Sequence, residues 1–511
     1  MAYQVKAASV EWNPSKERLR ELTEKMPNSR VTEFGNVAVK ARVDARSTRS
    51  TYLVDDSTNA TKQTITRAEY DRIAEAQDAY ISGAHMVVVD GYIGPDPGFR
   101  TRARLVIEAA NANVAGMQQQ LYYPVGDDYD PAGWEPDTTV VYTPNLPAPG
   151  YPDDRVIAVD LASNVTRVLN SDYFGESKKG GLRMWNNIVF DRGGLALHAG
   201  CKVIPAGGRN RTVLIVGLSG TGKTTTTFTT QLGSKPAQDD FVALMPGGRV
   251  HATENGCFAK TFGLDPAYEP AIYHATTQPE AYLENVSVDS SGKVDFFDTS
   301  YTKNGRTTWP FSYVDPWPAD QLEPAEFLLI LNRNENILPG VARLDRDQTA
   351  AYFMLGETTG TSAGGKDEEG KFLRVPGTNP FFPRDLADMG NRMLELLDSH
   401  PLQAFVLNTG SVGGGEGHPD SKKVRIPYSS AIVQGIVEGT IEWTADPDFG
   451  YEIATSVPGI DDIEILQPRR LYERRGRTDE YSAMVDRLKR ERRQYLASFE
   501  GLDPSIVKSI G

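Results

Sequence analysis

The run TVLIVGLSGTGKTTTT, residues 212–227, constrains the architecture of this 511-residue chain more than any other stretch. Its first five residues are apolar or β-branched, which predicts a buried strand. The glycine-rich turn that follows leads into a lysine and threonines, where we expect a helix to begin. The run therefore predicts a strand, a tight loop and a helix in direct succession, as in an α/β fold.

The turn itself matches the G-x-x-x-x-G-K-[ST] pattern at every fixed position. Glycines at these positions let backbone N–H groups turn inward around a polyphosphate. The lysine adds a positive charge for the outer phosphates, and the hydroxyl after it can ligate Mg²⁺. We therefore expect a nucleoside triphosphate site at Gly217, Leu218, Ser219, Gly220, Thr221, Gly222, Lys223 and Thr224.

The composition excludes several function classes. Acidic residues outnumber basic ones, 68 against 54, and the net charge of −14 argues against a nucleic-acid-binding surface. The N-terminus lacks the apolar run of a secretory signal, and no stretch approaches the roughly 20 apolar residues that cross a bilayer. Cys201 and Cys257 match no metal spacing, so we expect reduced thiols. These features predict a cytoplasmic enzyme, monomeric or a small homo-oligomer, without membrane or nucleic-acid partners.

The pattern along the chain predicts a mixed α/β protein. We expect an N-terminal domain over residues 1–200 and a C-terminal phosphate-loop domain over 201–511. The glycine-rich residues 355–372 have few apolar side chains, which is typical of a mobile lid. Apolar spacing predicts helices over 15–26, 67–82 and within 469–497, and strands over 86–94 and 327–332.

Three further polar groups flank the phosphate loop. Asp239 and Asp240 follow it by about fifteen residues, and paired carboxylates beside a phosphate site suit a divalent cation, although they are also typical of a turn. Lys178 and Lys179 are equally compatible with a solvated charge run. His198 lies in an apolar segment, where a histidine usually belongs to the core. Taken singly, none of these groups indicates a function.

Taken in order, these groups form a recognisable series. The chain contains, in succession, YFGESKKGG (173–181), LALHAG (195–200), GLSGTGKTT (217–225), QDD (238–240), ENGCFAKT (254–261), LENVSVD (283–289) and TKNGRTTWP (302–310). This series resembles the ATP-dependent phosphoenolpyruvate carboxykinase family. The resemblance is faint before residue 165, apart from ARSTRSTYLV at 45–54. It implies a two-lobed, carboxykinase-like fold with a P-loop nucleotide-binding domain.

The resemblance implies the reversible conversion of oxaloacetate and ATP to phosphoenolpyruvate, CO₂ and ADP. It places Lys179, His198 and Asp240 where the family ligates a catalytic Mn²⁺, and Thr224 where it ligates the Mg²⁺ of the nucleotide. A lysine ligates a metal only as the neutral amine. Its pKa must therefore be lowered by burial, by the metal and by cationic neighbours such as Lys178.

The resemblance also implies the substrate contacts. Arg46 and Arg306 match arginines that hold the carboxylate and phosphoryl group of the substrate, which suits a planar guanidinium. Tyr173 matches a tyrosine near the bound carboxylate or CO₂, and Asp239 lies behind the metal ligands. The catalytic set is then Arg46, Lys178, Lys179, Lys223 and Arg306. Outside the phosphate loop, the expected nucleotide contacts are Glu254, Arg306, Lys423 and Ser429.

Some residues depart from the family pattern. Phe241 follows the metal carboxylate where the family has an acidic residue, and Lys303 replaces the negative charge near the substrate arginine. Residues 355–372 differ from the lid sequence of the family. These departures concern substrate choice more than phosphoryl chemistry. The alternatives are a related P-loop kinase acting on a small molecule or a protein, a GTP-using carboxykinase, and a nucleotide-sensing relative without turnover.

Overall fold

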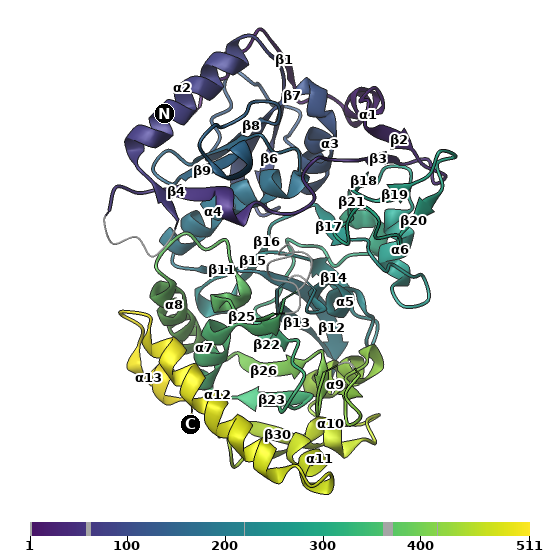
Figure 1. Ribbon diagram of the computed structural model, residues 1–511, viewed down its shortest axis with the longest axis vertical. Coiled ribbons are helices and arrows are strands. Elements are labelled where there is room, and N and C mark those ends of the chain that lie inside the picture. Colours follow the sequence, from purple (N-terminus) through teal and green to yellow (C-terminus); the bar gives the residue numbers. More distant parts are fainter. Residues whose placement is uncertain (1–2, 58–62, 219, 361–370, 416, 511) are drawn as a thin grey trace. The chain divides into compact units, whose positions relative to one another are not determined.

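The computed structural model describes residues 3–57, 63–218, 220–360, 371–415 and 417–510. It confirms the predicted mixed α/β class (Figure 1). The chain forms two compact units. Unit 1 contains residues 1–188 and 253–315, and unit 2 contains residues 189–252 and 316–511.

Unit 1 is built on an eight-stranded mixed sheet. Its strands, in spatial order, are β1 (Ser9–Trp12), β6 (His85–Ile93), β7 (Thr101–Glu108), β8 (Thr138–Thr143), β10 (Val165–Leu169), β9 (Val156–Asp160), β4 (Thr51–Val54) and β5 (Thr64–Ile65). The predicted helix over 67–82 is confirmed as α2 (Arg67–Ser82), which begins at a capping box between Thr66 and Glu69. After β10 the chain enters α4 (Phe174–Asp191), which carries the two adjacent lysines.

A second sheet explains why residues 253–315 belong to unit 1. Its strands, in spatial order, are β17 (Gly256–Lys260), β21 (Arg306–Pro310), β18 (Tyr282–Glu284), β3 (Val37–Val39) and β2 (Ser29–Val31). Because β18 pairs in parallel with β3, backbone hydrogen bonds join this later segment to the N-terminal residues. The two units therefore interleave along the sequence, which differs from the expected single boundary at residue 200.

Unit 2 contains the other eight-stranded sheet. Its strands, in spatial order, are β14 (Lys235–Gln238), β12 (Ala199–Ala206), β13 (Arg209–Val216), β22 (Ala325–Asn332), β26 (Gln403–Asn408), β23 (Val341–Leu344), β30 (Glu452–Ser456) and β29 (Glu442–Ala445). Alternate residues of β13 enter two apolar cores. Leu214 and Val216 face the core that includes α7 (Arg346–Leu355), α8 (Leu386–Ser399) and α12 (Thr478–Ala497). Val213 and Ile215 face the core of α9 (Ile426–Glu438), so both sides of this strand are buried.

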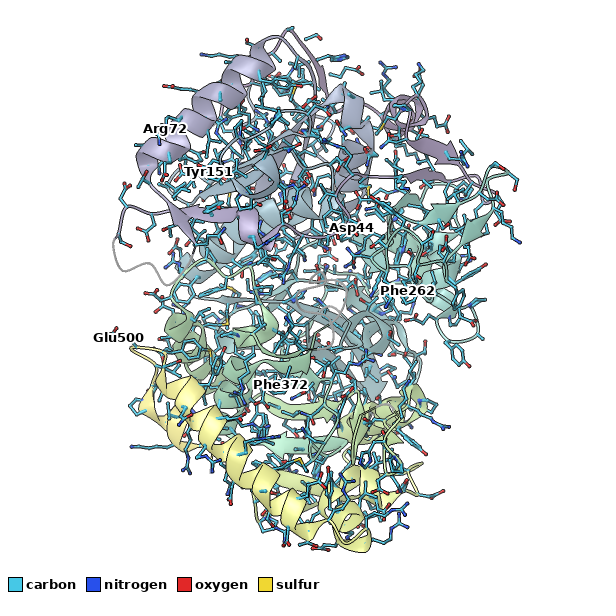
Figure 2. The ribbon with its side chains drawn as sticks, viewed as in Figure 1. Asp44, Arg72, Tyr151, Phe262, Phe372 and Glu500 are labelled. Atoms are coloured by element: carbon cyan, nitrogen blue, oxygen red, sulfur yellow. The ribbon has the colours of Figure 1, made fainter. Side chains whose placement is uncertain are left out.

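Two further predicted regions belong to unit 2. The expected lid over 355–372 contains β24 (Glu357–Thr359) and ends at Phe372, the first residue of β25 (Phe372–Arg374), which is labelled in Figure 2. The two strands pair with each other. Residues 361–370 lie outside the described residues. The helical spacing over 469–497 corresponds to α11 (Pro468–Arg474) and α12. Among the described helices, none is long and apolar enough to cross a membrane.

Candidate active site

The phosphate loop lies at the carboxyl end of β13, in the sheet of unit 2. Strand β13 runs parallel to β22, and β22 runs parallel to β26, so the carboxyl ends of three strands meet beside the loop. Open α/β sheets bind their ligands at the carboxyl ends of their strands. The loop continues into α5 (Lys223–Phe228), which confirms the strand, loop and helix expected from the sequence.

Hydrogen bonds within the loop and from the residue after β26 fix the described part of the loop. The Thr221 hydroxyl donates to the Leu218 carbonyl at 2.8 Å. Thr409, directly after β26, donates to the Thr221 carbonyl at 2.7 Å. Gly222 precedes α5 with a φ of +94°, a left-handed conformation that glycine adopts without strain. Ser219 lies outside the described residues.

The lysine of the loop belongs to a charged cluster within unit 2. Lys223 donates from Nζ to Oδ1 of Asp240 at 2.5 Å, and Nε2 of His198 lies 2.9 Å from the same oxygen. Nδ1 of His198 lies 2.8 Å from the carbonyl oxygen of Thr378. Lys223 and His198, which the sequence singles out in two other segments, therefore meet at the carboxylate of Asp240.

The ring of His198 is also fixed from its faces. Phe241 stacks on it with ring centroids 4.9 Å apart, and Phe381 meets it edge-on at 5.9 Å. The departure from the family pattern at Phe241 thus supplies an apolar wall against the imidazole. A histidine held in this way keeps a single ring orientation.

The imidazole and the carboxylate suit a divalent cation. Because Nδ1 of His198 faces the carbonyl of Thr378, Nδ1 carries the ring proton and Nε2 presents its lone pair in the neutral ring. That lone pair and an oxygen of Asp240 repel each other at 2.9 Å unless a proton or a metal cation joins them. Within the described residues, no group of three His, Cys, Asp or Glu side chains could hold a metal. A lysine amine or phosphate oxygens would have to complete the coordination.

In unit 1, the two adjacent lysines of α4 have different surroundings. Lys178 is fully buried, and its Nζ donates to Oε2 of Glu254 at 2.9 Å. Its ammonium also lies 5.6 Å from the ring centroid of Phe258. Lys179 is half-buried. Since Glu254 accepts from Lys178, its expected contact with a nucleotide stays a prediction.

Arg306, at the start of β21, is held by neutral groups. Its Nη2 donates to the side-chain oxygen of Asn304 at 2.8 Å, and its guanidinium lies 5.2 Å from the ring centroid of Phe258. Its Nε is buried and has no hydrogen-bond partner among the described residues. The hydroxyl of Tyr173 accepts from the amide of Asn304 at 3.4 Å, and burial raises the pKa of Tyr173. A buried guanidinium with an unused donor is suited to an anionic ligand.

Glu284 is a site residue that the sequence analysis does not assign. It is fully buried on β18, directly opposite Arg306 in the pairing of β18 with β21. Its Oε1 accepts from the backbone N–H of Phe174, while Oε2 has no hydrogen-bond partner among the described residues. Burial raises its pKa to about 8, so this acid is largely protonated at neutral pH. Its place in the LENVSVD segment is the signal that could have identified it.

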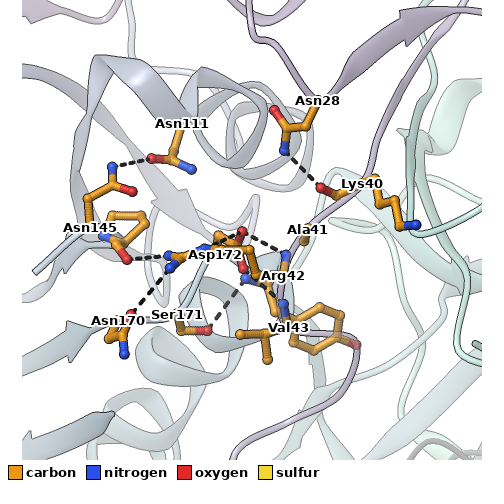
Figure 3. A network of polar contacts seen from close by, with 12 residues as sticks. Asn28, Lys40, Ala41, Arg42, Val43, Asn111, Asn145, Asn170, Ser171 and Asp172 are labelled. Carbon is orange, nitrogen blue, oxygen red and sulfur yellow. Dashed lines mark hydrogen bonds and ion pairs between the residues drawn. The ribbon is translucent and has the colours of Figure 1, made fainter. Parts of the chain in front are cut away.

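Arg46 lies on a loop of unit 1 that several hydrogen bonds hold. Before the loop, the backbone N–H groups of Arg42 and Val43 donate to the carboxylate of Asp172 at 2.8 and 3.0 Å (Figure 3). Within it, the carbonyl of Asp44, labelled in Figure 2, accepts from Asn304 at 2.6 Å.

Directly after Arg46, the N–H of Ser47 donates to Oε1 of Glu176 on α4 at 2.6 Å. The bond from Asn304 to the Asp44 carbonyl therefore connects the loop of Arg46 to the residue that also holds Arg306. Asn304 thus contacts the guanidinium of Arg306 directly and the backbone of the loop that carries Arg46.

Three further residues singled out by the sequence are more exposed than these clusters. Lys423 is exposed at the end of β28 (Lys422–Lys423), and Ser429 is half-buried in the first turn of α9. Lys303 is exposed. Both cysteines are buried thiols that take part in no disulfide.

Comparisons with known proteins agree with the sequence resemblance. A sequence model of the phosphoenolpyruvate carboxykinase family, in its ATP-dependent form, matches residues 8–463. The phosphoenolpyruvate carboxykinase (ATP) of Aeropyrum pernix is 32% identical over 96% of this chain and 95% of its own length. Phosphoenolpyruvate carboxykinase (ATP) 1 of Moorella thermoacetica is 29% identical over 91% of this chain and 89% of its own length. The chain is therefore similar to these relatives over nearly its whole length.

Proposed function

We infer that this chain, which belongs to the ATP-dependent phosphoenolpyruvate carboxykinase family, converts oxaloacetate and ATP to phosphoenolpyruvate, CO₂ and ADP. In this reaction the bond between oxaloacetate and its departing carboxylate breaks, and the electron pair passes to the enolate oxygen. That oxygen then forms a bond to the γ-phosphorus while the bond from the γ-phosphorus to ADP breaks. The observation that carries the proposal is the junction of Lys223, His198 and Asp240 beside a complete phosphate-loop motif.

We assign the phosphoryl chemistry to unit 2. Residues 217–224 bind the triphosphate through backbone N–H groups, and Lys223 exchanges its bond with Asp240 for oxygens of the outer phosphates. The hydroxyl of Thr224 is our candidate ligand for the metal of the nucleotide. Lys423 and Ser429 remain our candidates for contacts with the base and ribose, and Glu254 for a further nucleotide contact.

We assign the recognition of oxaloacetate to unit 1. Arg306 has a buried donor available, and Asn304 aligns it by a hydrogen bond to Nη2. Arg46 supplies a second guanidinium, and Tyr173 a buried hydroxyl. Two planar guanidinium groups suit a dicarboxylate, because each can give two parallel hydrogen bonds to one carboxylate.

We propose Lys179, His198 and Asp240 as the ligands of a catalytic divalent cation, with Mn²⁺ the better match for an amine, an imidazole and a carboxylate. When bound, this cation and the Mg²⁺ of the nucleotide supply positive charge that stabilises the enolate and phosphate oxygens. Lys178 is ion-paired with Glu254, and a cation at this position would favour the neutral amine of Lys179.

The test is an assay of oxaloacetate-dependent CO₂ release with Mn²⁺ and either ATP or GTP. We expect release with ATP that requires both oxaloacetate and nucleotide. Faster CO₂ release with GTP than with ATP would identify GTP as the nucleotide substrate. Hydrolysis or transfer of the γ-phosphate without CO₂ release would indicate a P-loop kinase, and nucleotide binding without any turnover would indicate a regulatory relative.

The Lys179→Ala variant tests the assignment of the metal ligands. We expect turnover to fall by roughly 10²-fold or more, because a ligand of the catalytic cation is lost. Binding of Mg–ADP, measured by calorimetry, should change little, since the phosphate loop is intact. An equal loss of turnover and of Mg–ADP affinity would contradict the separate role given to Lys179.

A further inference from the structure

A buried lysine on β12 has no role in the chemistry described above. Lys202 is fully buried, on the strand that pairs with β13, which leads into the phosphate loop. Its Nζ donates to the carbonyl of Thr226 at 3.0 Å, to the carbonyl of Thr229 at 2.6 Å, and to Oε1 of Gln231 at 2.5 Å. Burial lowers the pKa of Lys202 to about 7, and the three acceptors oppose this shift because they favour the ammonium, the form that offers three N–H donors.

The three acceptors place this ammonium at the end of the phosphate-loop helix. Thr226 belongs to α5, and Thr229 follows the last residue of that helix. The final carbonyls of a helix lack partners within it and carry a partial negative charge, so a cation is favourable there. Lys202 thus joins the carboxyl end of α5 to the sheet, at the end opposite Lys223.

The length of α5 gives this bond its importance. The helix has six residues and is about 9 Å long, far below the length at which a helix is stable alone. Its first two residues, Lys223 and Thr224, are the ones proposed to bind the outer phosphates and the metal. A shift of its last turn would therefore be transmitted directly to these two side chains.

A second branch leads from Lys202 to α9. Gln231 accepts from Lys202 and donates from Nε2 to the hydroxyl of Ser430 at 3.0 Å. Ser430 lies in α9, next to Ser429, our candidate contact for the base or ribose. One buried ammonium is therefore hydrogen-bonded to the phosphate-loop helix and, through one amide, to the segment proposed to bind the rest of the nucleotide.

We propose that Lys202 is a positioning residue for the nucleotide, which holds α5 and α9 in the arrangement that binds ATP. The proposal rests on the nucleotide site of the proposed function. A lysine that served stability alone would affect unfolding without distinguishing between the two substrates. A positioning residue should change nucleotide binding specifically.

The test compares Lys202→Met with Lys235→Met, a lysine on the neighbouring strand β14. Methionine has a similar length and no donor. We expect Lys202→Met to raise the Kd for Mg–ADP and the KM for ATP about tenfold, with the KM for oxaloacetate nearly unchanged. Lys235→Met should match the wild-type chain. Ser430→Ala interrupts only the branch to α9, and Gln231→Leu also removes one acceptor of Lys202; each should raise the Kd for Mg–ADP by a smaller factor.

Several results would overturn the proposal. One is a folded Lys202→Met protein with wild-type affinity for Mg–ADP, and another is an equal rise in both KM values. If Lys202→Met does not fold, unchanged Mg–ADP affinity in both Gln231→Leu and Ser430→Ala overturns it. A wild-type chain that releases no CO₂ from oxaloacetate would refute the proposed function, yet the Mg–ADP measurements would still decide the role of Lys202.

Discussion

In unit 2 the ammonium of Lys223 is hydrogen-bonded to the carboxylate of Asp240, whereas in unit 1 the guanidinium of Arg306 is held by the neutral amide of Asn304. The acid opposite Arg306, Glu284, has a pKa of about 8 because it is buried, so it compensates little of that charge at neutral pH. The cluster of Lys223 is thus neutralised until a phosphate or a cation competes for its partners. The surroundings of Arg306 retain a positive charge that can receive an anion directly. A chain with a net charge of −14 can therefore bind anions through local arrangement of its charges.

We expect the largest effect in unit 2, where the charge of Lys223 is balanced by Asp240. Asp240→Asn keeps the shape of the side chain but removes the negative charge between Lys223 and His198. We expect kcat to fall roughly 10²–10³-fold, because charge stabilisation of the reacting groups depends on this carboxylate. Steady-state assays over a range of Mn²⁺ concentrations measure the loss. A variant with wild-type kcat at every Mn²⁺ concentration would show that the cluster is structural.

In unit 1, where the charge of Arg306 is not balanced, a substitution should weaken substrate binding. Arg306→Lys keeps the charge and loses the planar fork, so we expect the KM for oxaloacetate to rise about tenfold, which corresponds to roughly 1.4 kcal/mol. Initial rates at saturating ATP give the value. Arg72→Lys, an exposed change in the same unit (Figure 2), serves as the control and should leave the KM as it is. A normal KM for the Arg306 variant would remove this arginine from the site.

The protonated state of Glu284 gives a smaller effect that depends on pH. Its pKa in the folded chain, about 8, exceeds its ordinary value of 4.5, so the folded state binds more protons between these values. The free energy of unfolding should therefore decrease as pH rises from about 4.5 to about 8. Glu284→Gln removes this contribution.

Thermal unfolding across that range measures the contribution of Glu284. The melting temperature of Glu284→Gln relative to the wild type should rise with pH by a few degrees. The exposed residue Glu500, labelled in Figure 2, provides the control substitution Glu500→Gln, which should follow the wild type. A constant difference between Glu284→Gln and the wild type would mean that Glu284 is charged in the folded chain.

The smallest effect concerns the thiols. Cys201 and Cys257 are buried and form no disulfide, and burial raises the pKa of Cys201 to about 12. A thiolate is the reactive form, so we expect a thiol reagent to leave both residues unmodified in the native chain. Denaturation should release two reactive thiols per chain. Rapid labelling of the native chain would contradict the burial.

Sequence reasoning reached those parts of the fold and site that rest on local patterns. The strand and glycine-rich turn before Lys223 follow from residues adjacent in the chain, and α2 follows from its apolar spacing. The meeting of His198 with Asp240 was expected only through the family resemblance, since no spacing in the sequence indicates it.

Other features depend on contacts between distant segments. The carbonyl of Thr378 that orients His198 comes from a residue 180 positions away. The bonds of Lys202 to the end of α5 involve neutral backbone oxygens, which leave no mark in the sequence. The return of residues 253–315 to unit 1 is likewise a matter of strand pairing across the chain.

That return has a consequence for how the protein is made. During synthesis, strand β3 emerges early but cannot pair with β18 until residues 282–284 have left the ribosome. By then the first segment of unit 2, residues 189–252, has also emerged. Its strand β13 cannot yet pair with β22, which is synthesised later. A fragment cut at residue 200 would expose the edge of β3 to pairing with other chains. Neither unit can therefore complete its sheets until much of the other unit has also been synthesised. We expect the chain to fold better when it is expressed whole than as separate fragments.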